Sequence, residues 1–141
     1  MSQEKAIARQ LFQEGYNCAQ SSFAAFSERI GLPREAAAKI ASAFGGGIVG
    51  SGNVCGAITG ALMAAGYAKG YLPEDGPEAK ERFMGEMKEI LNQFEEKHGS
   101  FMCTVLSEKV GLPEGAPKPE VKPCTVYVED MVELVAAYLD K

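Results

Sequence analysis

Residues 45–60 read Gly-Gly-Gly-Ile-Val-Gly-Ser-Gly-Asn-Val-Cys-Gly-Ala-Ile-Thr-Gly, a glycine-rich segment that leads into a run of small apolar residues. No charged residue occurs between Lys39 and Lys69, and eight of the 16 glycines fall in that interval. Because glycine is entropically costly to order, we expect the fold to require the backbone shape of this loop. We interpret the loop as the element that brings Cys55 to the start of a buried central helix.

That central helix is predicted to run from Val54 or Cys55 to Lys69. Along it, small residues recur every four positions and form a stripe without bulk: Gly56, Gly60, Ala64 and Ala68. Residues four apart share one face of a helix, so this stripe allows neighbouring helices to approach closely. The segment is therefore expected to lie in the middle of a bundle.

Helical periodicity or capping signals predict further helices on both sides of the loop. We expect them over residues 4–14, 18–29, 34–44 and 77–98, in a short segment around Cys103, and in a last helix with Pro123 in its first turn. Asn17 is the predicted N-cap of the helix that Cys18 opens. Residues 111–123 contain four prolines and predict an extended connector. No convincing alternating strand pattern occurs. The prediction is an all-α fold, a compact bundle of about six to seven helices in a single domain of residues 1–141.

Composition limits the classes of function. The net charge is −5 and no cluster of basic residues occurs, which argues against nucleic-acid binding. The uncharged run over residues 40–68 is long enough to span a bilayer, but its glycines interrupt it, so we expect no membrane insertion. The N-terminus lacks the apolar region of a signal peptide, which predicts a cytoplasmic protein.

Four cysteines share a placement that their spacing does not reveal: Cys18, Cys55, Cys103 and Cys124. Each is predicted to lie in the first turn of a helix, where partial positive charge and unpaired N–H groups favour a thiolate. This environment is expected to lower the pKa of a cysteine and to make it a nucleophile or a metal ligand.

Three interpretations of the cysteines remain open from the residues alone. They are small buried side chains, or thiols that cycle through disulfides, or ligands of one centre that holds zinc or an iron–sulfur cluster. Their separations match no zinc-finger or ferredoxin pattern. For the third interpretation, backbone N–H groups of the glycine loop are candidates to contact cluster sulfurs. We assign this cofactor-binding role to Gly45, Gly46, Gly47 and Gly56.

Two other features are interpreted as structural. The pattern Gly-x-Gly-x-x-Gly at residues 45–50 follows a predicted helix, whereas the dinucleotide fingerprint follows a strand. His98, the single histidine, is expected to be a solvated residue in the last turn of a helix. No pair of carboxylates in an apolar setting suggests acid–base catalysis, so the sequence does not decide whether the protein is an enzyme.

Together these segments resemble a known family. The motif elements are Gly15-Tyr16-Asn17-Cys18-Ala19-Gln20, Phe44-Gly45-Gly46-Gly47, Cys55-Gly56-Ala57-Ile58-Thr59-Gly60, Phe94, Gly99-Ser100, Cys103 and Cys124. They are similar to the C_GCAxxG_C_C family of redox-active proteins, over about residues 11–125 and with all four cysteines in order.

The resemblance implies a small helical redox protein, of a kind often associated with transporters. Related domains in larger redox proteins are thought to hold an iron–sulfur cluster on these cysteines. The expectation is therefore electron transfer or redox sensing through an iron–sulfur centre with Cys18, Cys55, Cys103 and Cys124 as ligands. A thiol–disulfide protein that uses the same cysteines and has no cofactor, and a zinc-stabilised interaction module, remain the alternatives. The expected partner is another redox protein, and a homo-oligomer is compatible with the sequence.

Overall fold

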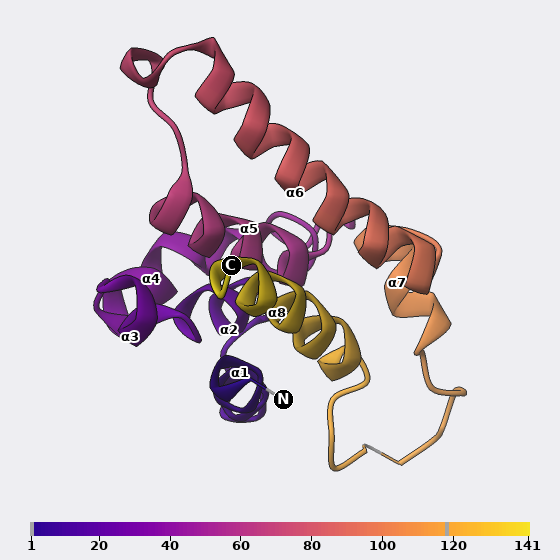
Figure 1. Cartoon of the computed structure of the whole chain (residues 1–141). Coiled ribbons are helices and arrows are strands. Elements are labelled where there is room, and N and C mark those ends of the chain that lie inside the picture. The colour runs from indigo at the N-terminus through magenta and orange to yellow at the C-terminus, as the bar shows by residue number, and fades with distance from the viewer. Residues whose placement is uncertain (1, 118) are drawn as a thin grey trace.

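The structure is a computed structural model that describes residues 2–117 and 119–141, and these residues form an all-helical protein (Figure 1). The helices are α1 (Gln3–Gln13), α2 (Cys18–Ala24), α3 (Ser27–Ile30), α4 (Arg34–Ala41), α5 (Gly56–Lys69), α6 (Pro77–His98), α7 (Cys103–Lys109) and α8 (Thr125–Leu139). Short 3-10 turns follow α4 (η1, Ser42–Phe44) and precede α6 (η2, Pro73–Asp75). The only extended pairing within the described ranges is an isolated antiparallel bridge between Val54 and Met102. The all-α prediction is confirmed.

The boundaries differ from the predicted ones in three places. The helix expected over residues 18–29 is divided into α2 and α3, which raises the number of α-helices to eight. The break occurs at Phe26, whose φ of −93° and ψ of 0° leave the helical region while its ring is fully buried. The helix expected over residues 34–44 tightens into a 3-10 turn after Ala41. Pro123 precedes α8 and does not lie in its first turn, because Cys124 caps the helix.

Helix α5 lies at the centre and packs against α2 and α8, while α1 packs against α8 and α4 against α2. Small residues make the contact between α5 and α2 close. A Cβ atom added at Gly60 would lie 2.3 Å from the carbonyl oxygen of Ala19, far inside van der Waals contact. The small-residue stripe therefore does what the sequence predicted: it lets a second helix backbone approach the first part of α5.

The glycine loop before α5 has an unusual backbone. All residues from 46 to 50 have positive φ, with values between 50° and 75°, so the chain makes a left-handed turn. Three of these residues are glycines, but Ile48 and Val49 are β-branched, and positive φ is strained for such side chains. Hydrogen bonds across the turn stabilise it, including one from the Asn53 N–H to the Gly47 carbonyl at 2.9 Å. The glycines thus let the loop close on itself.

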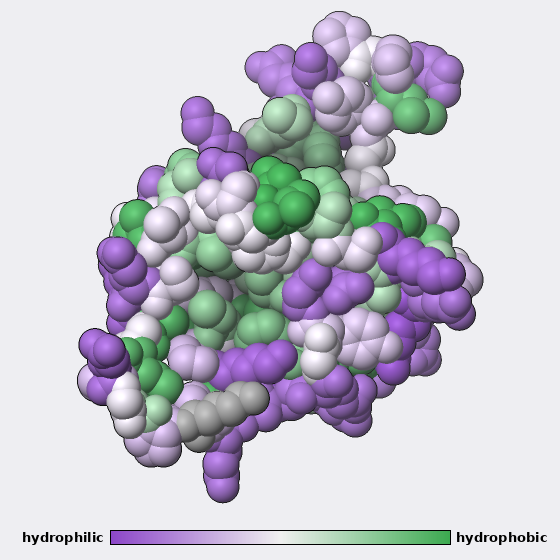
Figure 2. Space-filling model, turned by 180° about the vertical axis from the view of Figure 1, so that it is seen from behind, coloured by the Kyte–Doolittle hydropathy of each residue, from purple (hydrophilic) through white to green (hydrophobic). Residues whose placement is uncertain are grey.

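Helix α6 is arranged differently from the others. Its C-terminal part packs on the bundle through the buried residues Met87, Ile90 and Phe94. Its N-terminal part, together with η2, projects beyond the bundle (Figure 1). In the space-filling view the tip of this projection carries mostly polar side chains with an apolar group among them (Figure 2). Helix α6 therefore exposes much of its surface, whereas α5 is mostly covered.

A membrane-spanning helix is not found among the residues that the structure describes, because none of their helices is both long and apolar enough.

Candidate redox site at the helix starts

All four cysteines lie at helix starts, as the sequence predicts. Cys18 and Cys103 are the first residues of α2 and α7, and Cys55 and Cys124 are the residues immediately before α5 and α8. All four are free thiols. The start of α2 is fixed by a capping box, in which the Asn17 side chain accepts from the Gln20 N–H at 2.8 Å and the Gln20 side chain accepts from the Asn17 N–H at 3.0 Å. The predicted N-cap at Asn17 is confirmed.

Cys18 and Cys55 are brought together by the close packing of α2 on α5. A Cβ atom at Gly56, the residue after Cys55, would lie 2.5 Å from the Sγ atom of Cys18. Gly56 therefore leaves the space that the Cys18 thiol occupies. Cys55 itself is buried, with 6% of its surface exposed.

Cys103 joins Cys55 through a short backbone pairing beside the isolated bridge. The Cys55 N–H donates to the Phe101 carbonyl at 2.9 Å, and the Cys103 N–H donates to the Asn53 carbonyl at 2.6 Å. A Cβ atom at Gly47 would lie 2.7 Å from the Cβ of Cys103, so this glycine of the left-handed turn leaves room for that side chain. This pairing could not be predicted from the sequence, because a single bridge has no periodicity.

Cys124 reaches the same region from the end of the connector over residues 111–123. Tyr127 lies one turn further along α8, and burial is the main cause that raises the pKa of its hydroxyl. The thiolates of Cys124 and Cys55 raise that pKa further. The Tyr127 hydroxyl donates to the Leu106 carbonyl at 2.7 Å and so ties α8 to α7. Tyr127 therefore lies near two cysteines and holds the helix that carries a third.

The thiols influence one another's ionisation. Burial is the larger cause that raises the pKa of Cys55, Cys103 and Cys124, and a thiolate at Cys18 raises the pKa of all three further. Convergence of the four cysteines on one centre stays a prediction.

The predicted lowering of the cysteine pKa values is wrong for three of the four thiols. Burial raises the pKa of Cys55 to about 12, although the N–H groups of Ala57 and Ile58 act in the opposite direction. The pKa values of Cys103 and Cys124 are also raised, by burial first and then by neighbouring thiolates. Desolvation of the charged form therefore outweighs the helix start at these positions.

A metal centre needs several ligand side chains close together. In residues 2–117 and 119–141, no three side chains of His, Cys, Asp or Glu lie close enough to one another to hold a metal ion. The chemistry of the donor set nevertheless fits a sulfur-rich centre, because the converging groups are all thiols. Gly47 and Gly56 leave space beside Cys103 and Cys18. The buried hydroxyl of Thr125, next to Cys124, has no hydrogen-bond partner among the described residues.

The two remaining glycines that the sequence assigned to cofactor binding have identifiable packing contacts. A Cβ atom at Gly45 would lie 2.5 Å from the side chain of Asn17, and one at Gly46 would lie 2.8 Å from the Cα of Gly50. Gly45 thus supports the cap of α2, and Gly46 supports the turn itself. Contact between these glycines and a cofactor stays a prediction.

His98 is not the solvated residue that the sequence suggested. Its side chain is only 11% exposed, and its Nε2 lies 2.8 Å from a carboxylate oxygen of Asp130 on α8. Its ring lies against Phe94 and meets the ring of Tyr127 edge-on, with centroids 4.9 Å apart. The sequence could not reveal this cluster, because α6 and α8 come together only in the folded chain. His98 thus joins α6 to α8 through its contacts with Tyr127 and Asp130.

These observations define an all-helical protein with four cysteines at helix starts, one of which, Cys103, lies against a glycine of the left-handed turn. The chain belongs to the family described as "Putative redox-active protein (C_GCAxxG_C_C)", whose profile matches residues 16–138. The chain is also 35% identical over 118 residues to an uncharacterized protein of Archaeoglobus fulgidus, an alignment that covers 77% of this chain and 78% of the relative. No solved structure matches the chain.

Proposed function

We propose that this redox-family protein carries an iron–sulfur centre on Cys18, Cys55, Cys103 and Cys124 and uses it for electron transfer or redox sensing. The proposal is supported by the position of all four thiols at helix starts and by the contacts of Cys18 with Gly56 and of Cys103 with Gly47. Iron–sulfur clusters are held by cysteine thiolates, and four such ligands are the usual number. When bound, the centre would supply one-electron chemistry.

The glycines are expected to admit the centre. Gly47 and Gly56 lie against Cys103 and Cys18, where any side chain would collide with the cysteine. Without side chains at these positions, the backbone can approach the sulfur atoms of a cluster. Hydrogen bonds from backbone N–H groups to those sulfurs raise the reduction potential of the cluster. Gly45 and Gly46 are proposed to act indirectly: Gly45 leaves room for the Asn17 cap, and Gly46 lets the turn close.

Binding of the centre requires the thiols to lose their protons. Burial holds the pKa of Cys55 near 12 and raises those of Cys103 and Cys124, so these groups are thiols at neutral pH in the metal-free chain. Metal binding therefore releases protons, and loading is expected to be faster and tighter as the pH rises. Cys103 and Cys124 must also move closer to Cys18 and Cys55 than they lie in the described residues, and we assign that movement to α7 and the start of α8.

A second candidate function is thiol–disulfide exchange by the same cysteines. All four thiols are free, as this function requires. Disulfide exchange also needs only two thiols at a time, and no three potential metal ligands lie together among the described residues. In that case two thiols would lose two protons and two electrons to the disulfide of a partner protein and form an internal disulfide. A zinc-stabilised interaction module is a third outcome that the same experiment separates.

The experiment is anaerobic purification and reconstitution with iron and sulfide, followed by visible absorption and metal analysis. The proposal predicts charge-transfer bands together with iron and acid-labile sulfide in stoichiometric amounts. Colourless protein with stoichiometric zinc would support the interaction module. Metal-free protein that loses half of its free thiols on mild oxidation would support disulfide exchange.

Met131→Leu provides a control, because Met131 is a buried sulfur-containing side chain of α8 that is not among the proposed ligands. This volume-conserving change should leave the absorption and the iron content unaltered. A loss of iron in this variant equal to that of a cysteine variant would show that general destabilisation, and not ligation, controls loading. In the cell, we place the protein in the reducing cytoplasm, where thiols stay free, with another redox protein as its electron partner.

A further inference from the structure

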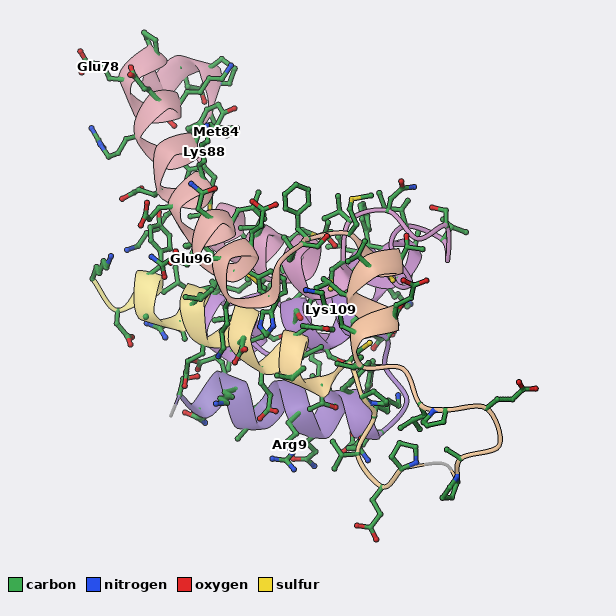
Figure 3. The ribbon with its side chains drawn as sticks, turned by 90° about the vertical axis from the view of Figure 1, so that its right-hand side faces the viewer. Arg9, Glu78, Met84, Lys88, Glu96 and Lys109 are labelled. Carbon is green, nitrogen blue, oxygen red and sulfur yellow. The ribbon has the colours of Figure 1, made fainter. Side chains whose placement is uncertain are left out.

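An apolar groove lies open where the projecting part of α6 leaves the bundle. The groove has a volume of about 490 Å³ and runs between α6 and the middle of α5. Its lining is almost entirely apolar and comes from Leu62 on α5 and from Met84, Gly85, Met87, Lys88 and Leu91 on α6. Met84 is 53% exposed in the described structure. Figure 3 shows Met84 and Lys88 one turn apart along the projecting part of the helix.

Gly85 is not explained by the packing of its own chain. It lies in the middle of a 22-residue helix, where glycine is less favourable than alanine. Its φ is not positive, and a Cβ atom at this position would meet nothing within 4 Å among the described residues. Gly60 on α5 differs, because there the missing side chain lets another helix backbone approach. A glycine of this kind on an exposed helix face indicates close approach by a backbone from outside the chain.

The charges beside Gly85 are arranged so that this face complements itself. Glu81 and Lys88 lie two turns apart on the same stripe as Met84 and Gly85, and all four are exposed. In an antiparallel pair of α6 helices with Gly85 opposite Met84 of the other copy, Glu81 lies opposite Lys88 and Lys88 opposite Glu81. A two-fold axis therefore places opposite charges at both ends of the contact.

We propose that the protein forms a two-fold homodimer in which the projecting parts of two α6 helices cross in antiparallel orientation at Gly85. Met84 of each copy fills the space above Gly85 of the other, and the apolar groove is covered at the same time. The paired charges of Glu81 and Lys88 fix the orientation of the crossing. This inference does not depend on the redox function, because none of the four cysteines lines the groove.

The experiment is sedimentation equilibrium of the full-length chain over micromolar concentrations, with helix content followed by circular dichroism. We expect a monomer–dimer equilibrium. Gly85→Gln introduces a good helix former that blocks close approach, and it should weaken the dimer at least about tenfold without loss of helix. Because the site of the change is open in the monomer, the variant should fold.

The charges offer a more specific test. Glu81→Lys should weaken the dimer at least about tenfold, since it places like charges opposite each other. The double variant Glu81→Lys with Lys88→Glu should restore the wild-type affinity, because the swapped charges face each other again across the axis. Glu114→Lys makes the same change in charge at an exposed position in the connector and should have no effect.

A chain that stays monomeric at all these concentrations overturns the proposal and leaves the groove for a different partner. A dimer whose affinity is unchanged by both Gly85→Gln and Glu81→Lys also overturns it, because its interface must then lie elsewhere. Failure of the double variant to recover affinity contradicts the antiparallel orientation.

Discussion

The four cysteines divide into two pairs that the fold holds in different ways. Cys18 and Cys55 belong to α2 and α5, which pack closely at the centre and bury at least half of their residues. Cys103 and Cys124 flank α7 and the exposed connector, and Leu106 is the only residue of α7 that is buried. The first pair is thus set by the core, whereas the second is attached through few contacts. The proposed four-cysteine site therefore has a fixed half, Cys18 and Cys55, and an adjustable half, Cys103 and Cys124.

This contrast gives a reason why no ready-made group of three metal ligands exists among the described residues. Local opening is easiest where few apolar contacts are buried, which describes α7 and the connector. Movement of Cys103 and Cys124 toward the fixed pair requires no rearrangement of the core.

Leu106→Ala should weaken the packing of α7, which carries Cys103, on the rest of the protein. Leu106 is 1% exposed, and truncation of a buried leucine costs about 2–5 kcal/mol. The loss should appear in urea unfolding followed by circular dichroism, with faster amide exchange in α7 than in α2. Val105→Ala, on the exposed face of the same helix, should change the free energy of unfolding by less than about 0.5 kcal/mol. An equally small effect of Leu106→Ala would mean that α7 is not held by its buried residue.

Gly60→Ala should disrupt the close packing of α5 on α2, the helices that hold Cys55 and Cys18. The new Cβ would lie 2.3 Å from the Ala19 carbonyl oxygen, so the helices must separate, and such overpacking costs about 1–3 kcal/mol. The same substitution at Gly66 on the same helix meets nothing within 4 Å and should be neutral or stabilise the protein by up to about 1 kcal/mol. Thermal and urea unfolding of both variants checks this, and equal effects at the two positions would refute the close packing of α2 on α5.

Tyr127→Phe should loosen the link between α8 and α7. The substitution removes the hydroxyl that donates to the Leu106 carbonyl at 2.7 Å, and such a hydrogen bond contributes about 1 kcal/mol to stability. Amide exchange should speed up in α7 but not in α5. Tyr67→Phe serves as the control, because Tyr67 is 56% exposed. Unchanged exchange in α7 would show that the hydrogen bond does not hold the helix.

In the metal-free chain, Cys103 should be alkylated faster than the buried Cys55. Cys103 is half-buried, whereas burial of Cys55 raises its pKa to about 12. Because the thiolate is the reactive form, iodoacetamide should label Cys55 at least about tenfold more slowly than Cys103 at neutral pH. The rate at Cys55 should continue to rise with pH toward about 12. Mass spectrometry of labelled peptides measures both rates, and equal rates would contradict the burial of Cys55.

Much of the fold could be predicted from the sequence, because the relevant signals are local. The helix over residues 77–98, the cap at Asn17 and the small-residue stripe of α5 were each expected from nearby residues, and the structure has them. The break at Phe26 was not expected, since it depends on how one ring enters the core. Local patterns thus predicted the elements but not where tertiary packing interrupts them.

The site was predictable only in part, for the same reason. The position of each cysteine at a helix start follows from local capping signals, and the structure confirms it. The direction of the pKa shifts follows from burial, which the sequence does not reveal, and the expected lowering was wrong for Cys55, Cys103 and Cys124. The contact of His98 with Asp130 joins two helices that are distant in the sequence, so no local pattern could predict it.

The most direct test of the four-cysteine site is the iron and sulfide content of the four single Cys→Ser variants after identical anaerobic reconstitution. If all four cysteines hold one centre, Cys18→Ser, Cys55→Ser, Cys103→Ser and Cys124→Ser should each lose most of the bound iron and its visible absorption while keeping the helix content of the wild-type protein. Full loading in Cys103→Ser and Cys124→Ser, with loss only in the other two, would contradict a single site that joins the fixed and the adjustable halves.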